Sequence, residues 1–100
     1  MQLLTEQACR TATDGLPNWQ YVAGKLSLSL TFNDFNEAWA FMSEVALVAT
    51  KMDHHPNWHN VYNRVNIELI THDLGGITEK DIALAQAVND LLRRRATEAS

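Results

Sequence analysis

An alternation of apolar and hydroxyl-bearing residues over positions 26–32 constrains the fold of this chain more than any other feature. Leucine or phenylalanine occupies every second position of the run LSLSLTF, and serine or threonine occupies the positions between them. Side chains of a β-strand point alternately to the two faces of a sheet, so the run predicts a strand with one buried and one wet face. Such a chain must also supply elements that cover the apolar face.

A long amphipathic helix is predicted to follow this strand. Asp34 and Glu37 match a helix start, because their side chains can accept hydrogen bonds from amides of the first turn. Apolar residues then recur at three- and four-residue spacing. The stripe is Phe35, Ala38, Met42, Val45, Ala49 and Met52, widened by Trp39, Phe41 and Val48. Pro56 disfavours a helical conformation in the residue before it, so His54 and His55 are expected on a loop just past the helix end.

Two further segments have strand character. Residues 19–23 predict a short strand, joined to the strand at 26–32 by a hairpin at Gly24-Lys25. Residues 60–72 have strand composition, and Gly75-Gly76 interrupts the segment that follows. One face of that strand would carry Val65, Ile67 and Leu69, and the other Asn66, Glu68, Ile70 and His72. Three strands in antiparallel order predict a single sheet with the helices on one face.

Helices are expected at both ends of the chain. Residues 1–13 show loose helical spacing, with Thr5 as a candidate cap. Thr78 with Asp81 begins a last helix, which we expect to end near Arg93–Arg95, because cations interact favourably with the carboxyl end of the helix dipole. The length of 100 residues leaves room for one hydrophobic core, so residues 1–100 are predicted to form a single α+β domain.

Charge and composition exclude several function classes. Eight basic and twelve acidic residues give a net charge of −4, which provides no electrostatic footprint for nucleic acid. No apolar stretch approaches the roughly 20 residues of a membrane span, and no secretory signal begins the sequence. Cys9 is the sole cysteine, so no internal disulfide can form. We therefore expect a cytoplasmic protein without a nucleic-acid or membrane partner.

All four histidines fall within residues 54–72, and three of them are candidates for chemistry. His54 and His55 follow the long helix, and His72 is expected at a strand end. Neither His54 nor His72 is expected to pack in the main core. Histidine can give or take a proton near neutral pH, because its unperturbed pKa is about 6.5. Carboxylates that could orient these imidazoles occur nearby, at Asp53, Asp73 and Asp81.

Three interpretations of the histidine cluster remain open from spacing alone. A zinc site would use imidazole ligands, but the pattern lacks His-Glu-x-x-His, no cysteines accompany the histidines, and the adjacent His54 and His55 would tend to point apart. The histidines could instead be solvent-exposed and inert at a helix end. The third interpretation is general acid–base catalysis.

A wider set of motifs resembles the pterin-4a-carbinolamine dehydratase family. The motifs are Asp53-His54-His55-Pro56-Asn57-Trp58, Val61-Tyr62-Asn63-Arg64-Val65, Thr71-His72, Gly75-Gly76 and Asp81. The resemblance implies a four-stranded antiparallel sheet with helices on one face, the fourth strand arising from a split of residues 60–72 near Arg64. It also implies a reaction: removal of water from a 4a-hydroxytetrahydropterin to give the quinonoid dihydropterin. That reaction recycles the cofactor of aromatic amino acid hydroxylases and needs neither metal nor redox cofactor.

The resemblance also implies roles for individual residues. His54 and His72 match the acid–base histidines of the family, and His55 matches the histidine assigned mainly to binding. The expected substrate-binding residues are Asp53, Ile70, Thr71, Asp73, Asp81 and Trp19. Asp81 could equally cap the last helix, and Trp19 could equally lie in the core. Many relatives carry glutamate four residues before His54, where this chain has Thr50. Asp53 or water is then expected to take over the role of that glutamate, or activity is lower.

The same resemblance leaves a second class of function open. Some animal relatives double as dimerisation cofactors for a homeodomain transcription factor, and some degenerate relatives help to assemble other proteins. The family is often tetrameric, and Trp39 and Phe41 widen the apolar surface of the long helix. A homodimer or homotetramer is therefore expected. The expected partners are a pterin substrate and, through the pathway, an aromatic amino acid hydroxylase.

Overall fold

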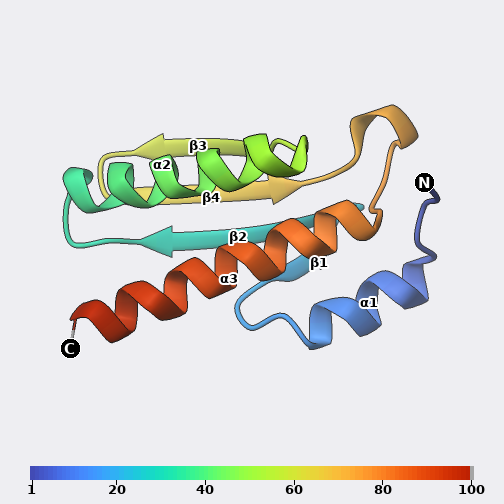
Figure 1. The fold of residues 1–100 in the computed structure, drawn as a ribbon. Coiled ribbons are helices and arrows are strands. Elements are labelled where there is room, and N and C mark those ends of the chain that lie inside the picture. Colours follow the sequence, from blue (N-terminus) through green and yellow to red (C-terminus); the bar gives the residue numbers. More distant parts are fainter. Residues whose placement is uncertain (100) are drawn as a thin grey trace.

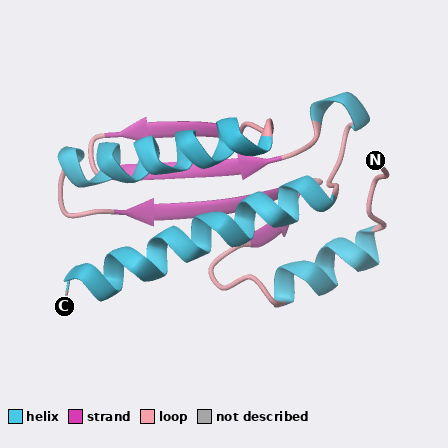
Figure 2. Ribbon diagram, in the orientation of Figure 1, coloured by secondary structure: helices cyan, strands magenta, loops and turns pink. Residues whose placement is uncertain are grey.

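A four-stranded antiparallel sheet forms the centre of the computed structural model, which describes the backbone of residues 1–99 and the side chains of residues 1–95. The sheet order is β1-β2-β4-β3. The strands are β1 (Gln20–Val22), β2 (Lys25–Thr31), β3 (Asn57–Val61) and β4 (Arg64–Leu69). The helices are α1 (Glu6–Asp14), α2 (Phe35–Met52) and α3 (Glu79–Ala99), with a short 3-10 helix, η1 (His72–Leu74). Figures 1 and 2 show the three α-helices on the same side of the sheet, which confirms the predicted α+β fold.

The alternation in β2 separates a buried face from a wet face, as predicted. Leu26 and Leu28 are buried and pair across the sheet with Leu69 and Ile67 of β4. Burying a side chain of this size contributes about 1.5–3 kcal/mol. The opposite face carries polar side chains in register, Ser27 beside Glu68 and Ser29 beside Asn66. The helices complete the buried side with Ala38, Phe41, Val45, Leu84, Ala85 and Val88.

The apolar stripe of α2 differs from the predicted stripe at one end. Phe41 is fully buried, and the centroid of its ring lies 5.2 Å from that of Phe32, the residue after β2. Phe35 is 44% exposed, and its ring stacks on the 57% exposed Trp39 at a centroid distance of 6.3 Å. Residues four apart share a helix face, so Phe35 turns to solvent together with Trp39. Including Phe35 in the buried stripe was therefore wrong.

The first hairpin turns one residue earlier than predicted. Its two central residues are Ala23 and Gly24, with φ angles of 54° and 76°, and Lys25 already belongs to β2. Positive φ at both central positions matches the twist of a two-residue β-hairpin. Trp19 lies just before β1 rather than in it, and its indole N–H donates a 3.0 Å hydrogen bond to Oδ1 of the buried Asn89.

The helix ends follow the sequence signals at α1 and α2 but not at the carboxyl end of α3. The hydroxyl of Thr5 accepts a hydrogen bond from the amide of Ala8, and the Asp34 carboxylate accepts one from the amide of Glu37, so both predicted caps are confirmed. The expected helix end near Arg93–Arg95 is wrong, because α3 continues to Ala99. Arg95 instead pairs with Glu44 of α2 at 2.8 Å and links the two long helices, and the guanidinium of Arg93 bonds to the Asp90 carboxylate within α3.

The segment from residue 57 to residue 69 splits into two strands. Tyr62 and Asn63 form the turn between β3 and β4, so the split near Arg64 is confirmed, although β3 already begins at Asn57. Cys9 is the buried residue of α1 that packs into the core, where burial raises the pKa of its thiol and keeps it protonated. No helix in the described part of the chain is both long enough and apolar enough to cross a lipid bilayer.

Candidate active site

The carboxyl end of α2 fixes the backbone of His54. Asp53 adopts the left-handed conformation, with φ 52° and ψ 43°, and its amide donates to the carbonyl of Thr50 at 3.1 Å. The amide of His54 donates to the carbonyl of Ala49 at 3.0 Å. This pair of bonds is a Schellman motif, which ends a helix by satisfying its last carbonyls. The predicted position of His54 and His55 just past the helix end is confirmed.

The side chain of His54 is buried beside Asp81, outside the cluster of apolar residues that forms the hydrophobic core. His54 is only 9% exposed, and its Nε2 lies 2.6 Å from Oδ1 of Asp81, which is completely buried. Asp81 lies in the first turn of α3, so the contact joins the end of one helix to the start of another. A buried carboxylate costs free energy unless it is paired and hydrogen-bonded, and His54 supplies that partner.

The other oxygen of Asp81 is held by two threonines. Oδ2 accepts 2.9 Å and 2.8 Å hydrogen bonds from the backbone N–H of Thr78 and the hydroxyl of Thr71. The two threonine hydroxyls are themselves 2.8 Å apart. The bond to the Thr78 amide caps α3, so the predicted capping role of Asp81 is confirmed, and the same carboxylate also reaches His54. Its predicted contact with substrate remains a prediction.

His72 lies beyond the sheet, not at a strand end as expected. β4 ends at Leu69, and Thr71 then pairs with Gly76 as an isolated bridge. The chain reverses between these two residues through η1 and through Gly75, whose φ is 69°. His72 is the first residue of η1 and is exposed, in line with the expectation that it stays out of the core. The β4 ladder cannot extend to His72, because the bridge to Gly76 redirects the backbone.

Two short connections bring His54 and His72 into one region. Thr71 bonds to Asp81, the partner of His54, and is also the residue directly before His72. From the other side, Asn57 follows His54 by three residues, and its Oδ1 lies 3.1 Å from Nε2 of His72. The sequence-predicted histidines are therefore linked through both the chain and its hydrogen bonds.

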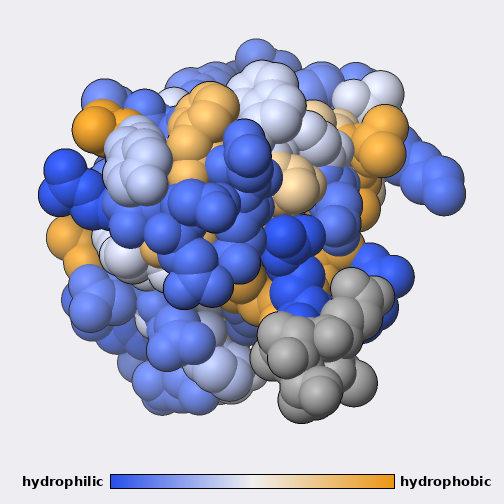
Figure 3. All heavy atoms as spheres, turned by 90° about the vertical axis from the view of Figure 1, so that its left-hand side faces the viewer, coloured by the Kyte–Doolittle hydropathy of each residue, from blue (hydrophilic) through white to orange (hydrophobic). Residues whose placement is uncertain are grey.

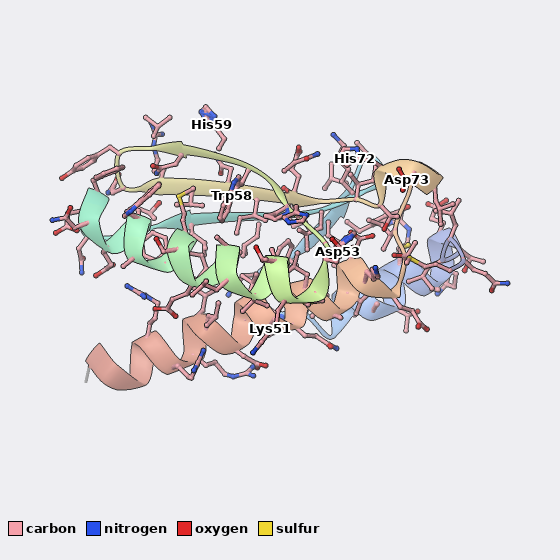
Figure 4. All side chains as sticks on the ribbon, turned by 45° about the horizontal axis from the view of Figure 1, so that its top comes forward. Lys51, Asp53, Trp58, His59, His72 and Asp73 are labelled. Carbon is pink, nitrogen blue, oxygen red and sulfur yellow. The ribbon has the colours of Figure 1, made fainter. Side chains whose placement is uncertain are left out.

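Of the remaining predicted site residues, four lie near the histidines, whereas Trp19 lies elsewhere in the core. Figure 4 shows Asp53 at the end of α2 and His72 and Asp73 on η1 at the same end of the molecule. The exposed residues are Asp53, His55 and Asp73, and the half-buried one is Ile70. Trp19 is 5% exposed, belongs to the hydrophobic core and bonds to Asn89 rather than to any residue of this region. Figure 4 also shows His59, the fourth histidine, projecting away from the sheet.

Two polar contacts of this region were not anticipated from the sequence. In the sequence Asn57 is one residue of the Asp53–Trp58 motif, and its contact with His72 depends on how η1 folds back toward the start of β3. Thr78 is predicted only to begin the last helix, but its hydroxyl also lies within hydrogen-bond distance of the Thr71 hydroxyl. A polar residue directly after Pro56 is the one sequence signal that could have singled out Asn57.

The arrangement is suited to proton transfer. Two imidazoles each have one ring nitrogen held by a side-chain oxygen, which fixes the ring and leaves the second nitrogen for exchange. Among residues whose side chains the structure describes, no three His, Cys, Asp or Glu side chains gather closely enough to hold a metal ion.

Comparison with known proteins identifies the relatives of this chain. Residues 2–91 match the family model described as pterin 4 alpha carbinolamine dehydratase. A Nitrobacter winogradskyi protein is 50% identical over 96 residues, covering 94% of this chain and 95% of its own length. A protein of Synechococcus sp. strain WH7803 is 53% identical over 89 residues, covering 89% and 96%. Both are named, provisionally, as pterin-4-alpha-carbinolamine dehydratases.

A solved structure agrees with the fold and with these relatives. The crystal structure of a transcriptional coactivator/pterin dehydratase from Brucella melitensis superimposes with a TM-score of 0.87 at 42% sequence identity. The match covers 90% of this chain and 98% of the Brucella chain.

Proposed function

The chain belongs to the pterin-4a-carbinolamine dehydratase family, and on that premise we propose that it removes water from a 4a-hydroxytetrahydropterin. The observation that carries the proposal is the buried His54–Asp81 pair, joined through Thr71 to the neighbouring, exposed His72. The product would be the quinonoid dihydropterin, and the activity would belong to one domain spanning residues 1–100.

The proposed reaction needs two proton transfers. One histidine, protonated, donates a proton to the 4a-hydroxyl, so that the C–O bond breaks and water departs. The other, neutral, accepts the proton of the neighbouring ring nitrogen, whose N–H electron pair forms the new C=N bond. His54 and His72 supply this acid and base, and the exposed His55 contributes mainly to binding. General acid–base groups typically accelerate a reaction by about 10²–10⁴-fold.

Other groups are proposed to bind the pterin and relay protons. Asp53, Thr71 and Asp73 lie directly beside a histidine in the sequence, and Ile70 lies two residues before His72, so these four are the nearest candidates for contacts to the pterin. Thr50 is exposed on the last turn of α2, where many relatives carry glutamate, and Asp53 or water would then relay the proton. No metal or redox cofactor takes part. The test is whether purified protein accelerates dehydration of a 4a-hydroxytetrahydropterin above the uncatalysed rate.

We also propose that the protein is a homodimer or homotetramer in the cytoplasm. Apolar side chains are exposed along α2, with Phe35 44%, Trp39 57% and Leu47 74% accessible. Figure 3 shows one end of the molecule, where orange apolar residues stand among blue hydrophilic ones. Large exposed apolar side chains on one helix favour contacts between copies of a chain.

Light scattering at micromolar concentration is expected to give a mass two or four times the chain mass of 11.3 kDa. Replacing Trp39→Ser should lower that mass, because it removes the largest exposed apolar side chain of α2. The matched control is Tyr62→Ser, which removes an exposed aromatic ring from the β3–β4 turn. A wild-type mass near 11.3 kDa would refute the oligomer.

A second candidate function is binding to another protein. The Brucella structure is described as a transcriptional coactivator as well as a pterin dehydratase, and the exposed side chains of α2 could contact a partner. The dehydratase remains the leading proposal, because His54, His55 and His72 are all present in this chain.

A further inference from the structure

A hydrogen-bonded series of three buried oxygen-bearing side chains, Thr78, Thr71 and Asp81, leads to the ring of His54. Thr78 and Asp81 are fully buried, and Thr71 and His54 are each 9% exposed. The consecutive distances are 2.8 Å between the two hydroxyls, 2.8 Å from Thr71 Oγ1 to Asp81 Oδ2, and 2.6 Å from Asp81 Oδ1 to His54 Nε2. These contacts connect the first residues of α3 to the end of α2.

The number of protons and acceptor sites on each side chain determines which group donates in each hydrogen bond of this series. A threonine hydroxyl has a single proton, and that of Thr71 is donated to Asp81. The Thr78 hydroxyl must then donate to Thr71, and it still accepts the amide of Lys80 at 3.3 Å. Oδ2 of Asp81 is filled by Thr71 and by the Thr78 amide, so only Oδ1 remains for His54. An ionised carboxylate only accepts hydrogen bonds, so Nε2 of His54 carries a proton.

The second ring nitrogen of His54 is therefore the exchangeable one. Among the residues whose side chains the structure describes, none bonds to Nδ1 of His54, and no buried side-chain nitrogen or oxygen lacks a partner. Nδ1 consequently contacts solvent, and it accepts a proton when the ring is neutral and donates one when the ring is charged. We propose that Thr78 is a positioning residue that, through Thr71 and Asp81, holds His54 as the Nε2–H tautomer with Nδ1 as its working nitrogen. The kinetic consequence rests on the dehydratase proposed above.

The test begins with the tautomer, which needs no substrate. Long-range ¹H–¹⁵N correlation spectra of protein with ¹⁵N-labelled histidine, recorded at alkaline pH, distinguish the two neutral forms. Wild-type His54 is expected as Nε2–H. Thr78→Val removes the hydroxyl at nearly constant shape and should populate both tautomers, with kcat lowered about 10-fold and little change in KM. Thr78→Ser keeps the hydroxyl and should restore both readouts.

Two further variants separate positioning from helix capping. Thr78→Gly also removes the hydroxyl, but glycine caps a helix nearly as well as threonine. This variant should therefore show the same tautomer mixture and the same kcat as Thr78→Val, with a smaller loss of stability. Thr5→Val removes the equivalent capping hydroxyl of α1 and should leave tautomer and kcat unchanged. An Nδ1–H tautomer in the wild type, or an unchanged tautomer and kcat in folded Thr78→Gly, would overturn the proposal. A wild-type Nε2–H tautomer without dehydratase activity would instead refute only the proposed function.

Discussion

Replacing His72→Ala is expected to lower kcat by about 10²–10⁴-fold without destabilising the fold. His72 is exposed on η1, and the hydrogen bond between its ring and Asn57 is exposed as well, so removing the ring leaves no buried partner of that bond unpaired. The loss of about 3–5 kcal/mol of transition-state stabilisation should therefore appear in kcat alone. Steady-state kinetics and a thermal melt of the same preparation measure the two effects.

The control for this prediction is His55→Ala, which removes another exposed histidine of the same region. Its effect should fall mainly on KM, because an interaction made equally in the ground and transition states changes binding rather than turnover. His59→Ala removes the histidine outside the region and should change neither parameter. If folded His72→Ala keeps near-full turnover, His72 is not one of the proton-transfer groups.

Replacing His54→Ala should remove activity to a similar degree and, unlike His72→Ala, should also destabilise the protein by about 3 kcal/mol. The substitution leaves Oδ1 of the fully buried Asp81 without its partner, and an unpaired buried charge is costly. That loss is a large share of the 5–15 kcal/mol by which a domain of this size is usually stable. Denaturant unfolding measures it, and kinetics must be taken well below the transition.

A double-mutant cycle measures the interaction energy between His54 and Asp81. Asp81→Asn keeps the oxygen that can cap α3 but removes the charge, so the double variant His54→Ala/Asp81→Asn should be less destabilised than the sum of the single variants. A coupling energy of 1 kcal/mol or more, about the lower range for residues in one hydrogen-bond network, is expected. Strictly additive free energies of unfolding would contradict the buried pairing of His54 with Asp81.

The sequence predicted those parts of the fold that depend on local periodicity. The alternation at 26–32 requires one buried face whatever the neighbours are, and the structure places Leu26 and Leu28 there. The capping pattern of Asp34 likewise acts within one helical turn. Phe35 was misplaced because its periodicity fits the stripe, whereas burial depends on which part of α2 the sheet covers.

The candidate site could be located from the sequence but not assembled from it. The position of Pro56 predicted that His54 follows a helix. Its burial depends instead on the packing of α3, which places Asp81, 27 residues later in the sequence, against the His54 ring. His72 was assigned to a strand because residues 60–72 keep strand composition, whereas the bridge between Thr71 and Gly76 ends the ladder first. Such contacts between distant segments leave no periodic signal in a single sequence.

The most direct test of the proposed dehydration is a stopped-flow measurement with a 4a-hydroxytetrahydropterin and purified wild-type protein, in the presence and absence of a strong chelator. The reaction also proceeds without catalyst, so the quantity to measure is the acceleration above that background. The acid–base mechanism predicts a saturable acceleration that the chelator leaves unchanged and that His72→Ala largely removes. A wild-type rate equal to the background, or an activity that is lost on chelation and restored by zinc, would contradict it.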